Sequence, residues 1–135
     1  MIKRNGKRIA SIAIAASIAF QNASPIMALE GKEVTTASDL IISEYVEGSS
    51  NNKAIELYNG TGEDLDLSKY TLELATNGSA TISKKIQLSG TLSHDKTYII
   101  ANPSAKPEIL AKADLKTGNL IHTGDDCIIL KKMEK

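Results

Sequence analysis

The sequence predicts an all-β domain over residues 39–135, because features typical of short strands and tight turns recur along this region. Apolar stretches of five to nine residues are separated by Gly, Asn, Asp and Ser. Several stretches alternate apolar and polar residues, which is the pattern of a half-buried strand. Asn-Gly dipeptides, which accept positive φ at both central positions of a tight hairpin turn, begin at Asn59 and Asn77.

The first predicted strands differ in composition. Residues 40–47 are rich in β-branched and aromatic side chains, whereas 53–58 and 70–75 alternate leucine or isoleucine with polar residues. We expect all three strands to be half-buried. Two further strands are predicted at 97–101, which should be buried, and at 127–130.

Turn and helix signals connect these strands. The Asn77-Gly78 dipeptide lies between 70–76 and 80–88, so a hairpin is expected there. Asp66-Leu67-Ser68 predicts a helical turn that leads into the strand at 70. One short helix is expected near 104–113, because Pro103 can stand in a first helical turn and apolar residues follow at helical spacing.

Residues 1–28 have the three-part organisation of a secretory signal peptide. A basic segment (3–8) precedes an uncharged apolar run (9–20) and a polar stretch that ends in a small residue. The apolar run of twelve residues is shorter than the roughly 20 that span a bilayer as a helix, so we expect no membrane anchor after cleavage. Residues 29–38 are polar and predict a linker. The remaining protein should be secreted or held at the cell surface.

The charge and cysteine content exclude some classes of protein. Loss of residues 1–28 would leave twelve basic against sixteen acidic residues. A mildly acidic chain lacks the basic face that binds phosphates, so no direct nucleic-acid binding is expected.

Cys127 is the only cysteine, which excludes a disulfide within the chain. Aliphatic packing must hold the core, and Cys127 is expected to be a small buried residue of a strand.

The residues that catalysis would require are scarce. Histidine is the usual general base near neutral pH, and only His94 and His122 occur, each beside a predicted turn. We expect both to lie in surface loops. The sequence contains no His-Glu-x-x-His, Cys-x-x-Cys or Gly-x-Ser-x-Gly motif. It therefore predicts a protein that is not an enzyme.

Acidic residues in predicted loops are weak candidates for a calcium site, since calcium binds oxygen ligands. One cluster is 63–66, and the other contains Asp125 and Asp126. Neither has the spacing of a known calcium loop. Because turn acids that accept hydrogen bonds from backbone amides explain both clusters, no cofactor is expected.

Four segments, in this order, resemble the lamin tail domain family. The most specific is 40–60, which contains Ser-Glu-Tyr near its start and Asn-Asn-Lys-Ala-Ile-Glu-Leu-Tyr-Asn near its end. The other segments are 66–75, 88–103 and 124–133. The resemblance implies an immunoglobulin-like β-sandwich without catalytic residues. It is closest to the exported bacterial type, whose members often accompany secreted or surface nucleases and phosphoesterases.

The sequence departs from this family near its C-terminal end. Bacterial members normally continue past the segment that resembles 125–132 with a turn and a further strand, whereas this sequence stops at Lys135. Three alternatives follow: the sandwich lacks its last strand, the chain is a truncated remnant of a secreted nuclease or phosphoesterase, or 30–38 supplies the edge. A missing strand would expose unpaired backbone groups.

The leading functional hypothesis is an exported non-catalytic binding or accessory module. Its partner would be an unknown protein or cell-surface ligand, including an extracellular nuclease or phosphoesterase domain. Loops at the ends of the sandwich would form the contact surface, with Ser49, Asn51 and Asn52 in one loop and Asn59 and Asp64 in another.

Two alternatives come from other classes of protein. The first is a small metal-dependent extracellular hydrolase that uses His122, Asp125 and Asp126. The second is a structural surface protein that associates through an exposed edge strand.

Overall fold

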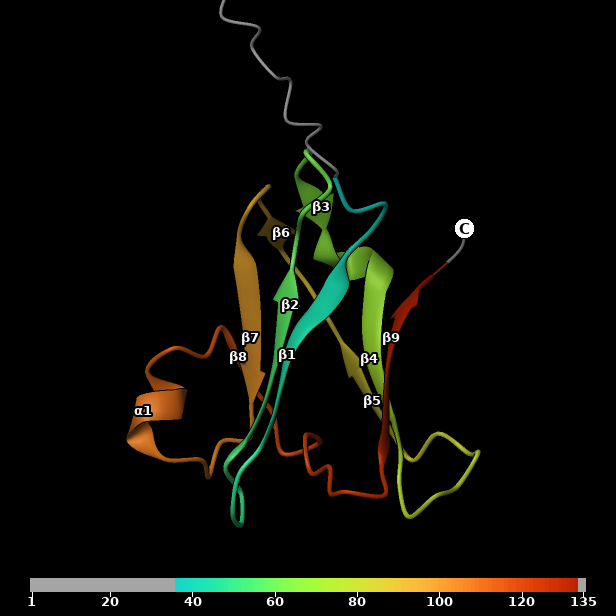
Figure 1. Cartoon of the computed structure of the whole chain (residues 1–135), viewed down its shortest axis with the longest axis vertical. Coiled ribbons are helices and arrows are strands. Elements are labelled where there is room, and N and C mark those ends of the chain that lie inside the picture. The colour runs from blue at the N-terminus through green and yellow to red at the C-terminus, as the bar shows by residue number, and fades with distance from the viewer. Residues whose placement is uncertain (1–35, 134–135) are drawn as a thin grey trace, which may run out of the picture. The chain divides into compact units, whose positions relative to one another are not determined.

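A computed structural model describes residues 36–133, which form two main β-sheets and a short two-stranded sheet (Figure 1). The first main sheet contains, in spatial order, β1 (Ile41–Glu47), β2 (Lys53–Tyr58), β7 (Thr97–Ala101) and β8 (Leu115–Lys116). The second contains β5 (Lys84–Gln87), β4 (Tyr70–Ala75) and β9 (Cys127–Lys132). The two-stranded sheet pairs β3 (Leu65–Asp66) with β6 (Thr91–Leu92). The predicted signal peptide, 1–28, lies outside the described residues.

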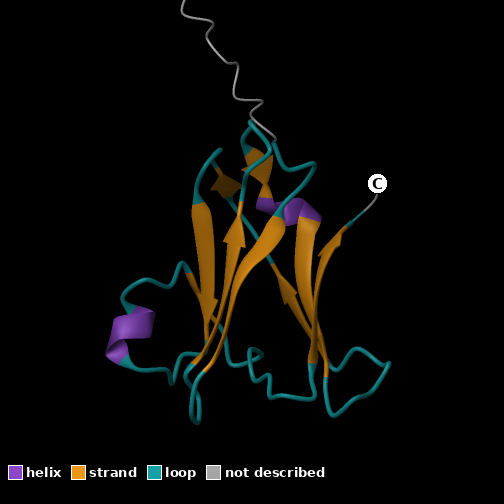
Figure 2. Ribbon diagram, in the orientation of Figure 1, coloured by secondary structure: helices purple, strands orange, loops and turns teal. Residues whose placement is uncertain are grey.

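The all-β prediction is confirmed. Strands make up most of the regular structure in Figure 2, beside the 3-10 helix η1 (Leu67–Lys69) and the short helix α1 (Pro107–Leu110). All five strands predicted between 40 and 130 are present. The helix falls within the predicted range, but Pro107 rather than Pro103 occupies its first turn. Asp66 caps η1 as predicted, since its Oδ1 accepts a hydrogen bond from the Ser68 amide at 3.0 Å.

The predicted hairpin between β4 and β5 is present, but its connection is longer than a two-residue turn. Asn77 and Gly78 both have positive φ, 57° and 64°. Strand β5 nevertheless begins only at Lys84. The reason is that the Gly78 amide donates to the carbonyl of Asp125 at 2.9 Å, so the turn binds the loop before β9 instead of closing the hairpin.

The core lies between the two main sheets and is almost entirely aliphatic, with Tyr70 as its aromatic member. Strand β4 is buried on both faces, whereas the sequence predicts a half-buried strand. Its central position explains this difference, because the register places Gln87 and Lys131 on either side of Thr71. Strand β1, at an edge, is more exposed than predicted.

Strand β9 forms the outer edge of the second sheet (Figure 1) and, among the described residues, pairs only with β4. Cys127 begins this edge strand and is exposed, so the prediction that it is buried is wrong. A residue at the end of an edge strand has a neighbouring strand on one side only.

No helix within 36–133 is long and apolar enough to cross a bilayer.

Candidate functional site

The two loops predicted to form one contact surface lie at opposite ends of the sandwich. Strand β2, six residues long, separates 48–52 from 59–64, and a strand of that length extends about 20 Å. In Figure 1 the β1–β2 hairpin is at the bottom and β3 is near the top. Ser49, Asn51 and Asn52 therefore cannot share a small ligand with Asn59 and Asp64.

Asn59 is fully buried and belongs to the fold. Its Nδ2 donates to the carbonyls of Glu63 and Leu92, each at 2.8 Å, and its Oδ1 accepts from the Thr61 amide at 3.1 Å. The prediction that Asn59 is part of an exposed contact surface is thus wrong. Asp64 is exposed, as expected, and accepts a hydrogen bond from the His94 amide at 3.1 Å.

At the other end, the hairpin loop leaves most of its side chains exposed. Ser49 and Asn51 are exposed and bond through their backbone carbonyls. The Oδ1 of Asn52 accepts from the Lys106 amide at 2.9 Å, which ties the hairpin to the segment preceding α1. At this end of the molecule, the exposed hairpin loop is therefore held next to the segment that leads into α1.

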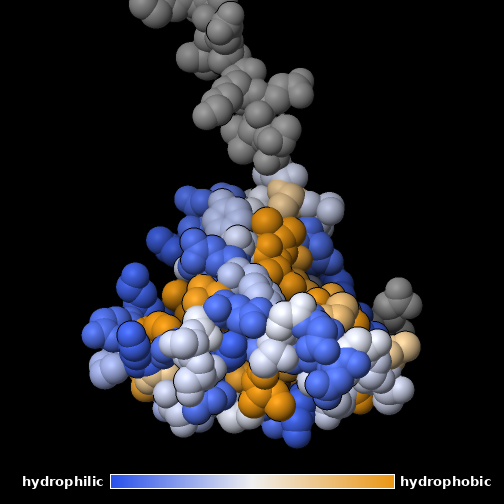
Figure 3. All heavy atoms as spheres, turned by 60° about the horizontal axis from the view of Figure 1, so that its bottom comes forward, coloured by the Kyte–Doolittle hydropathy of each residue, from blue (hydrophilic) through white to orange (hydrophobic). Residues whose placement is uncertain are grey.

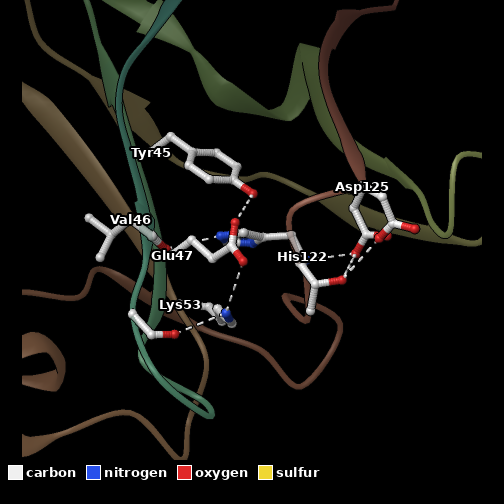
Figure 4. A network of polar contacts seen from close by, with 9 residues as sticks. Tyr45, Val46, Glu47, Lys53, His122 and Asp125 are labelled. Atoms are coloured by element: carbon white, nitrogen blue, oxygen red, sulfur yellow. Dashed lines mark hydrogen bonds and ion pairs between the residues drawn. The ribbon is translucent and has the colours of Figure 1, made fainter.

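His122 is fully buried, so the prediction of a surface position is wrong for this histidine. The loop before β9 places its ring against the edge of β1, with the ring centroid 4.5 Å from that of Tyr45 (Figure 4). Its Nε2 lies 3.0 Å from the Val46 carbonyl oxygen and must donate, because a carbonyl only accepts. Its Nδ1 has no hydrogen-bond partner among the described residues. Burial lowers the pKa of His122 below 6.5, which favours the neutral ring.

The two aspartates that could serve a hydrolase or calcium hold loops in place. Oδ1 of Asp126 accepts from the Asn77 amide at 2.7 Å, and Oδ2 accepts from the Thr123 amide at 2.8 Å. The Asn77 amide is the main cause of the lowered pKa of Asp126. Asp125 accepts from the Thr123 hydroxyl at 3.4 Å. Residues 36–133 contain no group of three or more His, Cys, Asp or Glu side chains that could hold a metal ion.

A polar network beside His122 fixes the root of the hairpin (Figure 4). The Lys53 side chain is buried, and its Nζ donates to the Gly48 carbonyl at 3.0 Å and lies 3.9 Å from Oε1 of Glu47. The Tyr45 hydroxyl donates to Oε2 of Glu47 at 3.2 Å. Because each of these groups has a partner within the fold, the network stabilises the hairpin and leaves little for a ligand.

Sequence reasoning missed a groove between α1 and the outer face of the first sheet. Its volume is about 300 Å³. The residues that line it are Glu44 and Val46 of β1, Ala54 and Glu56 of β2, Ile99 of β7, and Glu108, Ile109 and Lys112 of α1 and its end. We call its apolar members, Val46, Ala54, Ile99 and Ile109, the floor of the groove, and carboxylates of both the sheet and α1 also line it. Figure 3, which brings the lower end of Figure 1 forward, shows apolar patches among charged residues there.

Two of these carboxylates face each other across neighbouring strands. The β1–β2 register places Glu44 directly opposite Glu56, after a bulge between Ile42 and Glu44. Oε1 of Glu56 accepts from the Ser43 hydroxyl at 2.7 Å. In the described part of the chain, neither glutamate has a basic side chain within 4 Å, and the same is true of Glu108. The sequence signal that could have indicated this face of the sheet was the alternation of polar and apolar residues in β1 and β2.

The fold and this surface define a small β-sandwich module with a groove on one face. The residues suspected of catalysis, His122 and Asp126, instead make contacts that hold the structure together. The lamin tail domain family model matches residues 33–135, so the chain belongs to that family. This family is a non-catalytic, immunoglobulin-like one. Searches of curated proteins and of solved structures found no match.

Proposed function

We propose that this protein is an exported, non-catalytic module that binds a partner protein through the groove between α1 and the first sheet. The groove carries this proposal, because it combines an apolar floor with polar groups at its border, as binding sites generally do. The hairpin with Ser49 and Asn51 extends this surface, since Asn52 fixes the hairpin next to the segment that leads into α1. Export is supported by the basic and apolar pattern of residues 1–28.

The contacts of the alternative catalytic residues favour binding over hydrolysis. A metal-assisted hydrolase needs ligands that converge on one open position. Both oxygens of Asp126 instead accept backbone amide protons, and the ring of His122 is buried against Val46. Incubation with DNA, RNA and phosphoesters in calcium or magnesium should give no turnover. Turnover that is lost in Asp126→Asn would contradict the proposal.

Peptide binding tests the groove directly. The full chain, with its N-terminus determined by mass spectrometry, is applied to an array of random short peptides. Ala54→Leu places extra carbons on the groove floor, and it should remove most of the binding seen with the unmodified protein. Glu63→Gln, in the loop at the other end, is the matched control and should bind like the unmodified protein. Equal binding by all three proteins would exclude the groove.

Export is tested separately in the producing cells. The protein should be recovered outside the cytoplasm with a mass that corresponds to cleavage close to residue 28. Full-length protein confined to the cytoplasm would contradict this part of the proposal and leave the groove unaffected.

A second candidate function, self-association through β9, is favoured by the edge position of that strand, which within the described residues pairs only with β4. Ile129 on this strand is 38% exposed, and edge strands pair readily with other chains. Sedimentation velocity would then show a dimer that Ile129→Lys abolishes. Ile82→Lys, at an equally exposed isoleucine outside the strands, is the control.

A further inference from the structure

We infer that the groove takes a basic and apolar peptide segment of the partner, with an aliphatic side chain on the floor and a lysine or arginine between the carboxylates. This inference rests on the proposed function of the groove and adds the chemistry of its ligand. Three features of the groove support such a ligand: its charge, its floor and its size.

The charge of the groove is unbalanced. Glu44, Glu56 and Glu108 line it, against Lys112 as the one basic side chain. Glu44 and Glu56 are direct cross-strand neighbours, and like charges in that position repel each other. Within 36–133 no basic side chain comes within ion-pair distance of these glutamates. A cation bound between them would relieve this repulsion, whereas a phosphate would increase it.

The floor selects for a ligand that is partly apolar. Val46 stands opposite Ala54 in the register, and Ile99 lies beside Glu56 on the next strand. Ile109 of α1 completes the apolar surface. Lysine and arginine combine an apolar stem with a charged end, so one side chain can contact both the floor and the carboxylates.

The size of the groove fits side chains of a peptide better than a large cofactor. Its volume of about 300 Å³ lies at the lower limit of the range for ligand pockets, roughly 300 to 1,000 Å³. The groove is lined by residues of β1, β2, β7 and the α1 segment, so its surface is built from several side chains of different elements. A short segment of a protein partner meets these conditions.

Fluorescence anisotropy with labelled peptides tests the inference on the full chain. The probe is Gly-Leu-Lys-Ile-Arg-Gly, compared with versions in which glutamine or glutamate replaces both basic residues. The basic peptide should bind about tenfold more tightly than the glutamine version, and the glutamate version should not bind. Raising the salt concentration should weaken only the basic peptide, because salt screens the charges.

Variants of the protein then distinguish the contribution of the glutamate charges from that of the shape of the groove. Glu44→Gln combined with Glu56→Gln should weaken the basic peptide about tenfold and leave the glutamine peptide unchanged. Ala54→Leu should abolish binding of both, and Glu63→Gln should change neither. If Ala54→Leu does not fold, as judged by circular dichroism, Ile109→Lys takes its place, since it removes floor and adds a repelling charge.

The outcomes distinguish the two proposals. If the basic and glutamine peptides bind equally and Ala54→Leu removes both, the groove is a binding site but the inferred ligand charge is wrong. If no peptide distinguishes the unmodified protein from Ala54→Leu or Ile109→Lys, the groove function itself is wrong. Displacement of the peptide by a second copy of the chain, seen as concentration-dependent dimers, would also overturn the inference.

Discussion

Polar side chains in the end loops and carboxylates around the groove differ in what they contact. The Asn59 side chain donates to the backbone carbonyls of Glu63 and Leu92, and the Asp126 carboxylate accepts from the backbone amides of Asn77 and Thr123. Among residues 36–133, Glu44 has no such partner, and it faces a second glutamate. The same kind of residue thus stabilises the fold in one region and leaves charge available in the other. A polar residue in a loop is therefore a poor indicator of a binding site in this molecule.

Asn59→Ala should give the largest loss of stability. It removes the two hydrogen bonds that Nδ2 donates from a fully buried position to the carbonyls of Glu63 and Leu92, which should lower the free energy of unfolding by about 3 kcal/mol. Urea denaturation measures this loss. Asn51→Ala, in the exposed hairpin, should change stability by less than about 0.5 kcal/mol. Equal effects of the two substitutions would remove the distinction between structural and exposed loop residues.

Asp126→Asn should have a smaller effect of the same kind. The asparagine side chain has one acceptor oxygen for the two amides of Asn77 and Thr123, so we expect a loss of about 1.5 kcal/mol. Because the pKa of Asp126 is lowered by folding, its contribution is present above the unfolded pKa and fades as the pH falls below about 4. Thermal unfolding at pH 7 and pH 3 should show that the effect of the substitution shrinks in acid.

His122 should make stability depend on pH in a different range. Its pKa is lowered in the folded protein, so the unfolded chain binds more protons below about pH 6.5 and stability falls with acidification. The loss between pH 7.5 and 5.5 should be at most about 1.4 kcal/mol. His122→Gln should remove this slope. An unchanged slope would show that folding does not lower the pKa of His122.

Glu44→Gln should act in the opposite direction. Removing one of two like charges that face each other across β1 and β2 should raise stability by a few tenths of a kcal/mol, about 0.3. High salt should reduce this gain, since it screens the repulsion. A loss of stability would show that the fold, not a ligand, requires the charge.

Calcium should have no effect. The oxygens of Asp126 already accept two amide protons, so the melting temperature should be the same in calcium and in EDTA. An increase with calcium that disappears in Asp125→Asn would restore the calcium site as a candidate.

The elements of this fold could be predicted because their signals are local. Alternation in 53–58 and the Asn77-Gly78 turn depend on residues close in sequence. Burial was predicted less well, because it depends on which strands lie at an edge. Cys127 was assigned to the correct strand, but its exposure follows from the position of β9 in the sheet.

The candidate site was harder to predict than the fold, because it depends on contacts between distant segments. His122 meets Val46, 76 residues earlier in the chain. The groove brings β1, β2 and β7 together with α1. No pattern within one segment indicates either contact.

The pairing of β9 with β4 also has a consequence for how the protein folds. It joins Tyr70 to Lys132, so a long intervening segment must be closed before the second sheet is complete. Contacts between residues so far apart slow folding, because chain entropy is lost before they form. We expect refolding on a timescale of milliseconds to seconds, with the β1–β2 hairpin able to form first. During synthesis the pairing of β9 with β4 cannot form until the β9 segment has left the ribosome.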